Sequence, residues 1–144
     1  MSSDSDRIVD LYERNARNYV VDRRGAGWDE SAWLDRFIAL LPEEAAILDI
    51  GCGCGEPIAR YFIDRNFTVE GVDASPSLVS LCRERFPNHG VAMGSYHGEP
   101  LYHASLAAEE YRGLLEANGF RVAEHVSEDP NCGRHTIWLA QAAK

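Results

Sequence analysis

The stretch Ile47-Leu48-Asp49-Ile50-Gly51-Cys52-Gly53-Cys54-Gly55 decides the fold of this chain. The apolar run that leads into it, from Ala45 to Ile50, predicts a buried strand. The three glycines at alternate positions predict a turn whose backbone a ligand can approach closely. A helix over residues 56–65 follows, since Pro57 suits a first helical turn, and Asn66 is expected to end it as a left-handed cap. Strand, turn and helix in this order are expected to leave unpaired backbone N–H groups at the carboxyl end of the strand.

A second apolar strand also ends on an acidic residue. Residues 68–73 read Thr-Val-Glu-Gly-Val-Asp, and a carboxylate at the position of Asp73 can accept hydrogen bonds from two ribose hydroxyls. Ser75 and Pro76 then predict the start of another helix, which Pro87 ends. The order strand, helix, strand, helix predicts half of a doubly wound α/β sheet.

The spacing of the glycines argues against a ligand that carries phosphates. A dinucleotide site needs G-x-G-x-x-G; Gly51 and Gly53 fit, but the third position holds Glu56, whose carboxylate would repel a pyrophosphate. The loop also lacks the Lys-Ser/Thr pair of a phosphate-binding P-loop. An adenosine ligand with a positive centre and no phosphate suits such an acidic site better.

With these two motifs the sequence resembles the class I S-adenosylmethionine-dependent methyltransferases. Their first motif is an acidic residue followed by G-x-G-x-G, and their second is an acidic residue that closes the next strand. The resemblance implies S-adenosylmethionine as the cofactor, with its methionine part against the glycine loop and its ribose held by Asp73. The residues expected at the cofactor through these motifs are Asp49, Gly51, Cys52, Gly53, Gly55, Asp73, Ala74 and Ser75.

Two helices precede the glycine stretch. Residues 6–24 and 29–41 place apolar and aromatic side chains at helical spacing. The helices either pack on the core alone, or the first also forms a lid over the ligand through Tyr12, Tyr19 and Arg24. They look like the cofactor-covering helices of small bacterial methyltransferases of this class, which adds Tyr19 and Arg24 to the expected cofactor contacts.

The second half of the chain departs from a complete Rossmann-like sheet. Residues 87–104 are mostly turn formers with at most a short strand at 91–93, too few for a further strand–helix–strand unit of about 30 residues. A helix that begins at Ser105 and strands at 120–126 and 135–140 then predict a C-terminal antiparallel hairpin. Since family members normally carry three more strands in this region, we expect a truncated Rossmann-like (class I methyltransferase) α/β sheet.

This order predicts a single domain over residues 1–144. It would consist of an N-terminal helical cap (1–42), a cofactor-binding half (43–88) and an acceptor side (89–144). The strand at 45–50 is apolar on both faces and should lie between two neighbours, one of which is missing. An open strand edge invites pairing, so we expect either the hairpin or a second copy of the chain, as a homodimer, to close it.

The resemblance implies methyl transfer to a small-molecule acceptor. A base is needed only where the acceptor must lose a proton. His103 is the first candidate, followed by His97 and His89, with Tyr102 as an aromatic or hydroxyl contact; alternatively, Tyr102 and His103 only pack beneath the last helix. His125 and His135 are expected to be structural. Two other functions remain open: a module that binds S-adenosylmethionine or its product without turnover, and an interaction protein with a vestigial cofactor site.

Charge and cysteine content restrict the partners. With 14 basic and 23 acidic residues the net charge is −9, which disfavours nucleic acid and anionic membranes. The acidic first residues do not resemble a signal peptide, and no apolar run approaches the roughly 20 residues of a membrane span, so we expect a cytosolic location. No metal site is expected, because the cysteines lack paired CxxC-type spacing and are interpreted as small buried residues. They are Cys52, Cys54, Cys82 and Cys132.

Overall fold

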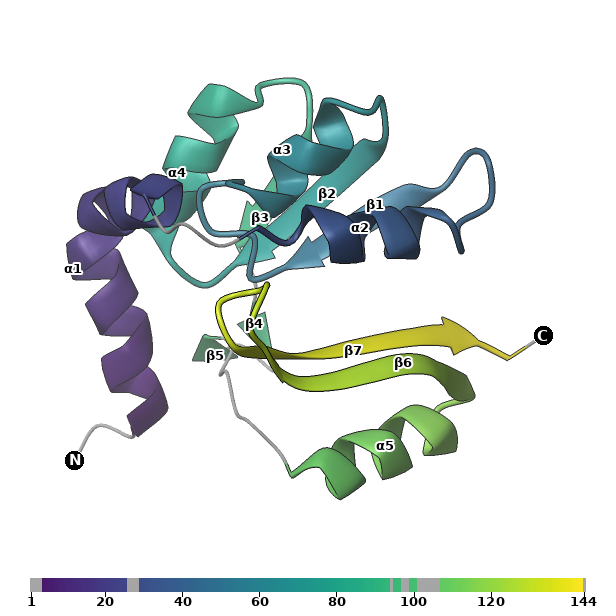
Figure 1. Cartoon of the computed structure of the whole chain (residues 1–144). Coiled ribbons are helices and arrows are strands. Elements are labelled where there is room, and N and C mark those ends of the chain that lie inside the picture. The colour runs from purple at the N-terminus through teal and green to yellow at the C-terminus, as the bar shows by residue number, and fades with distance from the viewer. Residues whose placement is uncertain (1–3, 26–28, 94, 97–98, 101–106, 144) are drawn as a thin grey trace. The chain divides into compact units, whose positions relative to one another are not determined.

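The structure, a computed structural model, describes residues 4–25, 29–93, 95–96, 99–100 and 107–143. By their contacts, the elements fall into two units, one of residues 1–26 and 42–103 and the other of residues 27–41 and 104–144. In chain order the elements are α1 (Asp4–Gly25), α2 (Ser31–Ile38), β1 (Ala46–Ile50), α3 (Ile58–Ile63), β2 (Thr68–Asp73), α4 (Pro76–Arg85), β3 (Gly90–Met93), β4 (Ser95–Tyr96), β5 (Glu99–Pro100), α5 (Ala108–Ala117), β6 (Phe120–Asp129) and β7 (His135–Ala142) (Figure 1).

The first unit is built on a three-stranded parallel sheet in the order β1-β2-β3. In its register Asp49 lies opposite Gly71, and Asp73 lies opposite Met93. Because parallel strands share one carboxyl edge, the end of β1 with its glycine loop and the end of β2 with Asp73 are neighbours. The short strand that the sequence allowed at 91–93 is present as β3, which pairs with β2 over residues 90–93. The truncated Rossmann-like α/β fold is confirmed.

Helices α3 and α4 pack against this sheet (Figure 1). The expected start of α4 is confirmed, because the Ser75 hydroxyl accepts a hydrogen bond from the Leu78 N–H at 3.2 Å. The left-handed residue expected after α3 is also present, since Asn66 has a φ of 65°. The buried apolar side chains of this unit are those of Ala16, Val20, Ile47, Cys52, Cys54, Ala59, Phe62, Val69, Leu78, Val79, Cys82 and Phe86.

Helix α1 is bent at Asn15, which has non-helical angles of φ −110° and ψ 15°. The Asn15 side-chain amide donates to the Leu11 carbonyl at 2.9 Å, a bond of the kind that competes with the helical backbone ladder. After the bend, Ala16 and Val20 are buried. Before it, Leu11 is 53% exposed and Tyr12 is 42% exposed. The apolar stripe expected along the whole helix therefore reaches the core only after the bend.

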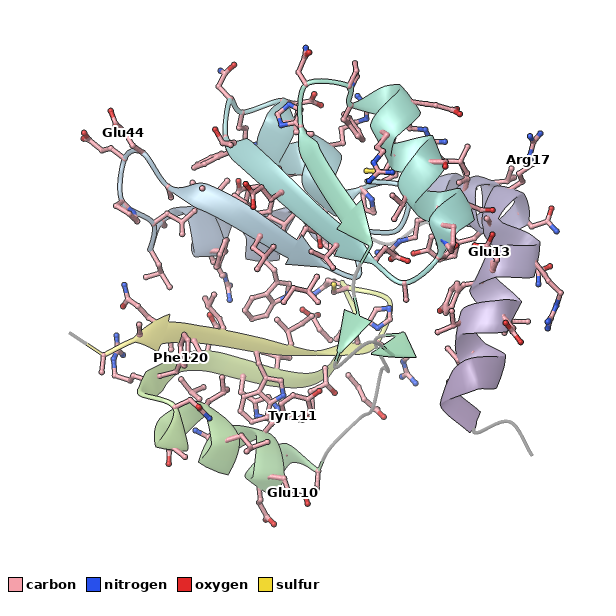
Figure 2. The ribbon with its side chains drawn as sticks, turned by 180° about the vertical axis from the view of Figure 1, so that it is seen from behind. Glu13, Arg17, Glu44, Glu110, Tyr111 and Phe120 are labelled. Carbon is pink, nitrogen blue, oxygen red and sulfur yellow. The ribbon has the colours of Figure 1, made fainter. Side chains whose placement is uncertain are left out.

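The second unit contains the expected hairpin, with β6 and β7 antiparallel in a two-stranded sheet. Helix α2 is tied to it, because the Trp33 indole donates to the Asp129 carboxylate at 2.6 Å. Helix α5 begins at Ala108 rather than after Ser105, since the Ala107 N–H donates to the Glu110 side chain at 2.9 Å and so starts the helix later. Figure 2 shows Tyr111 on the hairpin side of α5, where its ring stacks on Trp138.

Strand β1 is an edge strand among the strands that the structure describes, paired with β2 alone. Its side chains Leu48 and Ile50 are 59% and 60% exposed. Within the described residues the hairpin is a two-stranded sheet of its own, and its closure of the β1 edge stays a prediction. The homodimer stays a prediction. No helix within the described part of the chain has the length and apolar character needed to cross a membrane.

Candidate functional site

The glycine loop after β1 has a backbone that side chains would disturb. Gly51, Gly53 and Gly55 have φ values of 81°, 53° and 80°, all in the left-handed region. A Cβ on Gly53 would lie 3.3 Å from the Tyr19 ring, and one on Gly55 would lie 2.5 Å from the Phe86 ring. The loop is therefore restricted to glycine both by its own conformation and by the rings packed against it.

The loop N–H groups are used within the protein. The N–H groups of Gly51 and Cys52 both donate to the Val72 carbonyl, at 2.7 and 3.1 Å, and that of Gly55 donates to the Cys52 carbonyl at 2.8 Å. The Gly53 N–H donates to Asp73 at 2.8 Å. The expectation of unpaired donors is therefore wrong for these four groups, because the loop folds back on the end of β2. A phosphate would have to displace these bonds, which adds a physical reason for a ligand without phosphates.

Asp73 faces the glycine loop and links it to the start of α4. One carboxylate oxygen accepts from the Gly53 N–H and the other from the Ser75 N–H, both at 2.8 Å. A carboxylate offers about four acceptor positions, so two bonds leave capacity for further donors. Ribose hydroxyls are donors of the required kind.

A pocket of about 380 Å³ lies between α1, the glycine loop and the start of α4. This volume is within the range of about 300–1,000 Å³ that small-molecule sites occupy. Tyr12 and Tyr19 meet edge to face with ring centroids 5.4 Å apart, and burial raises the pKa of Tyr19, so this wall offers neutral aromatic surface. The lining residues are Ile8, Val9, Tyr12, Tyr19, Gly51, Gly53, Asp73, Ala74, Ser75 and Leu78.

Six of the predicted cofactor residues thus meet in one pocket: Tyr19, Gly51, Gly53, Asp73, Ala74 and Ser75. The sequence does not predict three further pocket residues, Ile8, Val9 and Leu78. Helical spacing does mark Ile8 and Leu78 as apolar positions, but it does not distinguish a side chain in the core from one that borders a ligand.

Three other predicted residues lie beside this wall rather than in it. Burial, with a smaller contribution from the charge of Asp73, raises the pKa of Asp49 to about 6. The Cys52 side chain is turned toward Cys82, and the hydrogen bond between the two thiols, with burial, raises the pKa of Cys52. Gly55 packs under Phe86 and Cys82. These three residues support the glycine loop without lining the pocket.

Most of the residues predicted on the acceptor side fall outside the part of the chain that the structure describes. Tyr102, His103 and His97 lie outside the described residues, and so does the side chain of Arg24. His89 lines a separate cavity of about 10 Å³ beside Cys52 and Cys82, not the larger pocket.

All four cysteines of the sequence are buried free thiols.

The two hairpin histidines lie in the strands expected from the sequence, and their structural role stays a prediction. His125 lies opposite Trp138 in the strand register, and its ring stacks on the indole with centroids 3.7 Å apart. His135 opens β7.

Comparison with known proteins gives partial matches in sequence and fuller ones in fold. No protein-family model matches the chain. The uncharacterized methyltransferase YodH of Bacillus subtilis (strain 168) is 35% identical over 69 residues, which are 48% of this chain and 29% of YodH. A TehB-like SAM-dependent methyltransferase from Corynebacterium glutamicum superposes with a TM-score of 0.63 at 18% identity, over 94% of this chain and 98% of that chain.

A third similar protein is CalS10 of Micromonospora echinaspora, an amino pentose methyltransferase solved with SAM bound. It is 33% identical, with a TM-score of 0.45, over 54% of this chain and 34% of CalS10. The chain therefore spans about a third or less of YodH and of CalS10. The superposition on the TehB-like protein shows the fold.

Proposed function

We propose that this chain, which has the sequence motifs and the fold of the class I S-adenosylmethionine-dependent methyltransferases, binds S-adenosylmethionine in the pocket between α1 and the glycine loop. The observation that carries the proposal is the position of Asp73. Its carboxylate lies in the pocket wall, fixed between the Gly53 and Ser75 N–H groups, with acceptor capacity left for a ribose.

The pocket suits the parts of this cofactor. Tyr12, Tyr19 and Leu78 supply aromatic and apolar surface for a flat base. The loop at Gly51 and Gly53 carries no side chains, so it lets the methionine part approach the backbone. The carboxylate of Asp73 and the net charge of −9 favour a ligand with a cationic centre and no phosphate.

The proposed reaction is methyl transfer to a small-molecule acceptor. The bound cofactor supplies an electrophilic methyl group, so the protein contributes mainly binding, orientation and exclusion of water. Tyr102 and His103 are the proposed acceptor-side residues, His103 as a base where the acceptor must lose a proton. A cytosolic location belongs to the same proposal. Because the chain spans only 29% of YodH, activity of this chain by itself is part of what must be tested.

Two other functions make different predictions. A binding module would hold the cofactor or its product, S-adenosylhomocysteine, without transferring a methyl group. An interaction protein with a vestigial site would bind neither, and its exposed β1 edge, with Leu48 and Ile50, would be the functional surface.

Isothermal titration calorimetry with S-adenosylhomocysteine tests the proposal. We expect binding by the wild type and a loss of at least tenfold in affinity for Asp73→Asn, because hydrogen bonds to a charged group contribute roughly 1.5–3 kcal/mol. Asp64→Asn removes an exposed carboxylate at the end of α3 and serves as the charge-matched control. ATP and NAD should give no heat.

Absence of heat with wild-type protein would refute the cofactor site and favour the interaction protein. Binding without transfer of the labelled methyl group to any member of an acceptor panel would favour the module.

A further inference from the structure

Glu13, which the sequence analysis did not single out, joins α1 to the start of α4. Its carboxylate accepts three hydrogen bonds: from the Ser75 hydroxyl at 2.5 Å, from the Ser77 hydroxyl at 2.5 Å and from the Ser77 N–H at 3.0 Å. Figure 2 shows Glu13 between the ribbons of the two helices. These bonds lower the pKa of Glu13 below its ordinary value, and the bonds from the Ser75 and Ser77 hydroxyls contribute most. The carboxylate is therefore ionised at neutral pH.

The bonded groups lie at the first turn of α4, where backbone N–H groups have no helical partners and the helix dipole favours negative charge. Ser75 already caps this turn through its hydroxyl oxygen, and Glu13 in turn accepts the proton of that hydroxyl. A carboxylate from another helix therefore completes the cap of α4. Ser75 is 1% exposed, so the contact is shielded from water on one side.

The bend in α1 gives this contact a second consequence. After Asn15 the helix is anchored by the buried Ala16 and Val20, which cluster with Cys54 and Leu78. Before Asn15, the exposed fractions of Leu11 and Tyr12 show much weaker packing. Yet this weakly packed half carries Ile8, Val9 and Tyr12, which form one wall of the pocket.

We propose that Glu13 is a positioning residue: its carboxylate fastens the half of α1 before Asn15 to the start of α4 and thereby holds Ile8, Val9 and Tyr12 in the pocket wall. The part of this inference that concerns the cofactor rests on the proposed function. When the bonds break, this half of α1 swings about Asn15 and opens the pocket, so Glu13 governs the rate at which the cofactor leaves.

Two measurements on the full chain test the inference. The first is amide hydrogen exchange of the ligand-free protein, read over residues 8–14 and over residues 16–25. Glu13→Ala should speed exchange about tenfold in the first segment and leave the second near the wild-type rate, because hydrogen bonds to a carboxylate are among the stronger ones. The second is the dissociation rate of S-adenosylhomocysteine, which should rise by a similar factor.

Asp10→Ala is the matched control. Asp10 lies in the same half of α1 and carries the same charge, but its side chain is 67% exposed and forms an ion pair with Arg14 at 4.0 Å. It should change neither measurement. Glu13→Gln keeps the shape of the side chain and one acceptor oxygen, so it should restore part of the wild-type behaviour. If Glu13→Ala fails to fold, Ser77→Ala removes one donor to Glu13 and should show the same effects at smaller size.

The outcomes separate the two proposals. Unchanged exchange over residues 8–14 in a folded Glu13→Ala would overturn the fastening role whether or not any cofactor binds. Faster exchange with an unchanged dissociation rate would overturn the positioning role at the pocket. If the wild type binds no S-adenosylhomocysteine, the proposed function fails, and the exchange measurement alone decides whether Glu13 fastens α1.

Discussion

Three glycines allow the steric role of the glycine loop to be measured separately from its backbone conformation. Gly55 has a φ of 80°, and an added Cβ would lie 2.5 Å from a Phe86 ring carbon and 2.9 Å from the Cys82 sulfur. Gly119, after α5, has almost the same φ of 79°, but an added Cβ would meet nothing within 4 Å. Gly113, inside α5, has neither constraint. Alanine at Gly113 therefore changes only helix propensity, and alanine at Gly119 adds only the strain of a left-handed φ. Alanine at Gly55 combines this strain with a steric clash.

The magnitudes follow from this comparison. Gly113→Ala should stabilise by roughly 0.5–1 kcal/mol, because alanine favours an exposed helix interior. Gly119→Ala should cost about 1–2 kcal/mol for a left-handed residue with a Cβ. Gly55→Ala should cost that amount plus about 1–3 kcal/mol for overpacking against buried neighbours, in total about 2–5 kcal/mol. Such a loss is a large part of the roughly 5–15 kcal/mol that stabilises an ordinary domain.

Urea unfolding followed by circular dichroism and by tryptophan fluorescence measures these differences. The tryptophans, Trp28, Trp33 and Trp138, all lie outside residues 1–26 and 42–103, so fluorescence reports mainly on the second unit. Gly55→Ala should move the dichroism transition, while Gly119→Ala should move the fluorescence transition. If Gly55→Ala is no more destabilising than Gly119→Ala, the contact of the loop with Phe86 and Cys82 does not constrain residue 55, and our account of the loop is refuted.

Further predictions concern Asp49, Trp33, Ser75 and Leu48. Folding raises the pKa of Asp49 from its ordinary 3.8 to about 6, so the folded protein binds the proton more tightly than the unfolded chain. The free energy of unfolding should therefore decline by roughly 1–3 kcal/mol as the pH rises from about 4 to 6. Asp49→Asn should remove this decline in urea titrations across that pH range. Trp33→Phe removes the indole donor to Asp129 and should lower the urea midpoint seen by the fluorescence of Trp28 and Trp138, whereas an unchanged midpoint would show that this bond contributes nothing. Ser75→Ala should cost about 1–2 kcal/mol through loss of the α4 cap, and a cost near zero would contradict the cap geometry. If two copies pair through β1, light scattering after size exclusion should give a dimer for the wild type and a monomer for Leu48→Lys; a monomeric wild type removes the dimer.

The parts of this fold that sequence predicts are those governed by neighbours in the chain. The glycine loop, the capped start at Ser75 and the left-handed Asn66 depend on local backbone chemistry, and each appears where the sequence placed it. The pairing of residues 90–93 with β2 could not be settled in this way. Its strand is short and lies among turn formers, so tertiary contact decides its conformation.

The candidate site also combines features that the sequence predicts with features that depend on tertiary contacts. Asp73 was predictable because strand ends converge on one edge of a parallel sheet. The hydrogen bonds that the loop N–H groups make within the protein were not predictable, since they depend on how far the loop folds back on Val72. Nor was Glu13, because a single carboxylate on an amphipathic helix gives no sign that its partners lie 62 and 64 residues away. The bend at Asn15 likewise occurs beside a side-chain hydrogen bond that helical periodicity does not reveal.

The two bonds that Asp73 accepts have a consequence for the thermodynamics of recognition. They cross-link the loop and the next helix before any ligand arrives, so the free protein already has the shape of its recognition surface. A ligand then loses its own freedom on association but does not have to order the receptor as well, which is the part of the entropic cost that rigid sites avoid. Discrimination at this edge of the sheet would then depend on complementarity to a fixed template, and ligands with bulk opposite Gly53 would be rejected rather than accommodated.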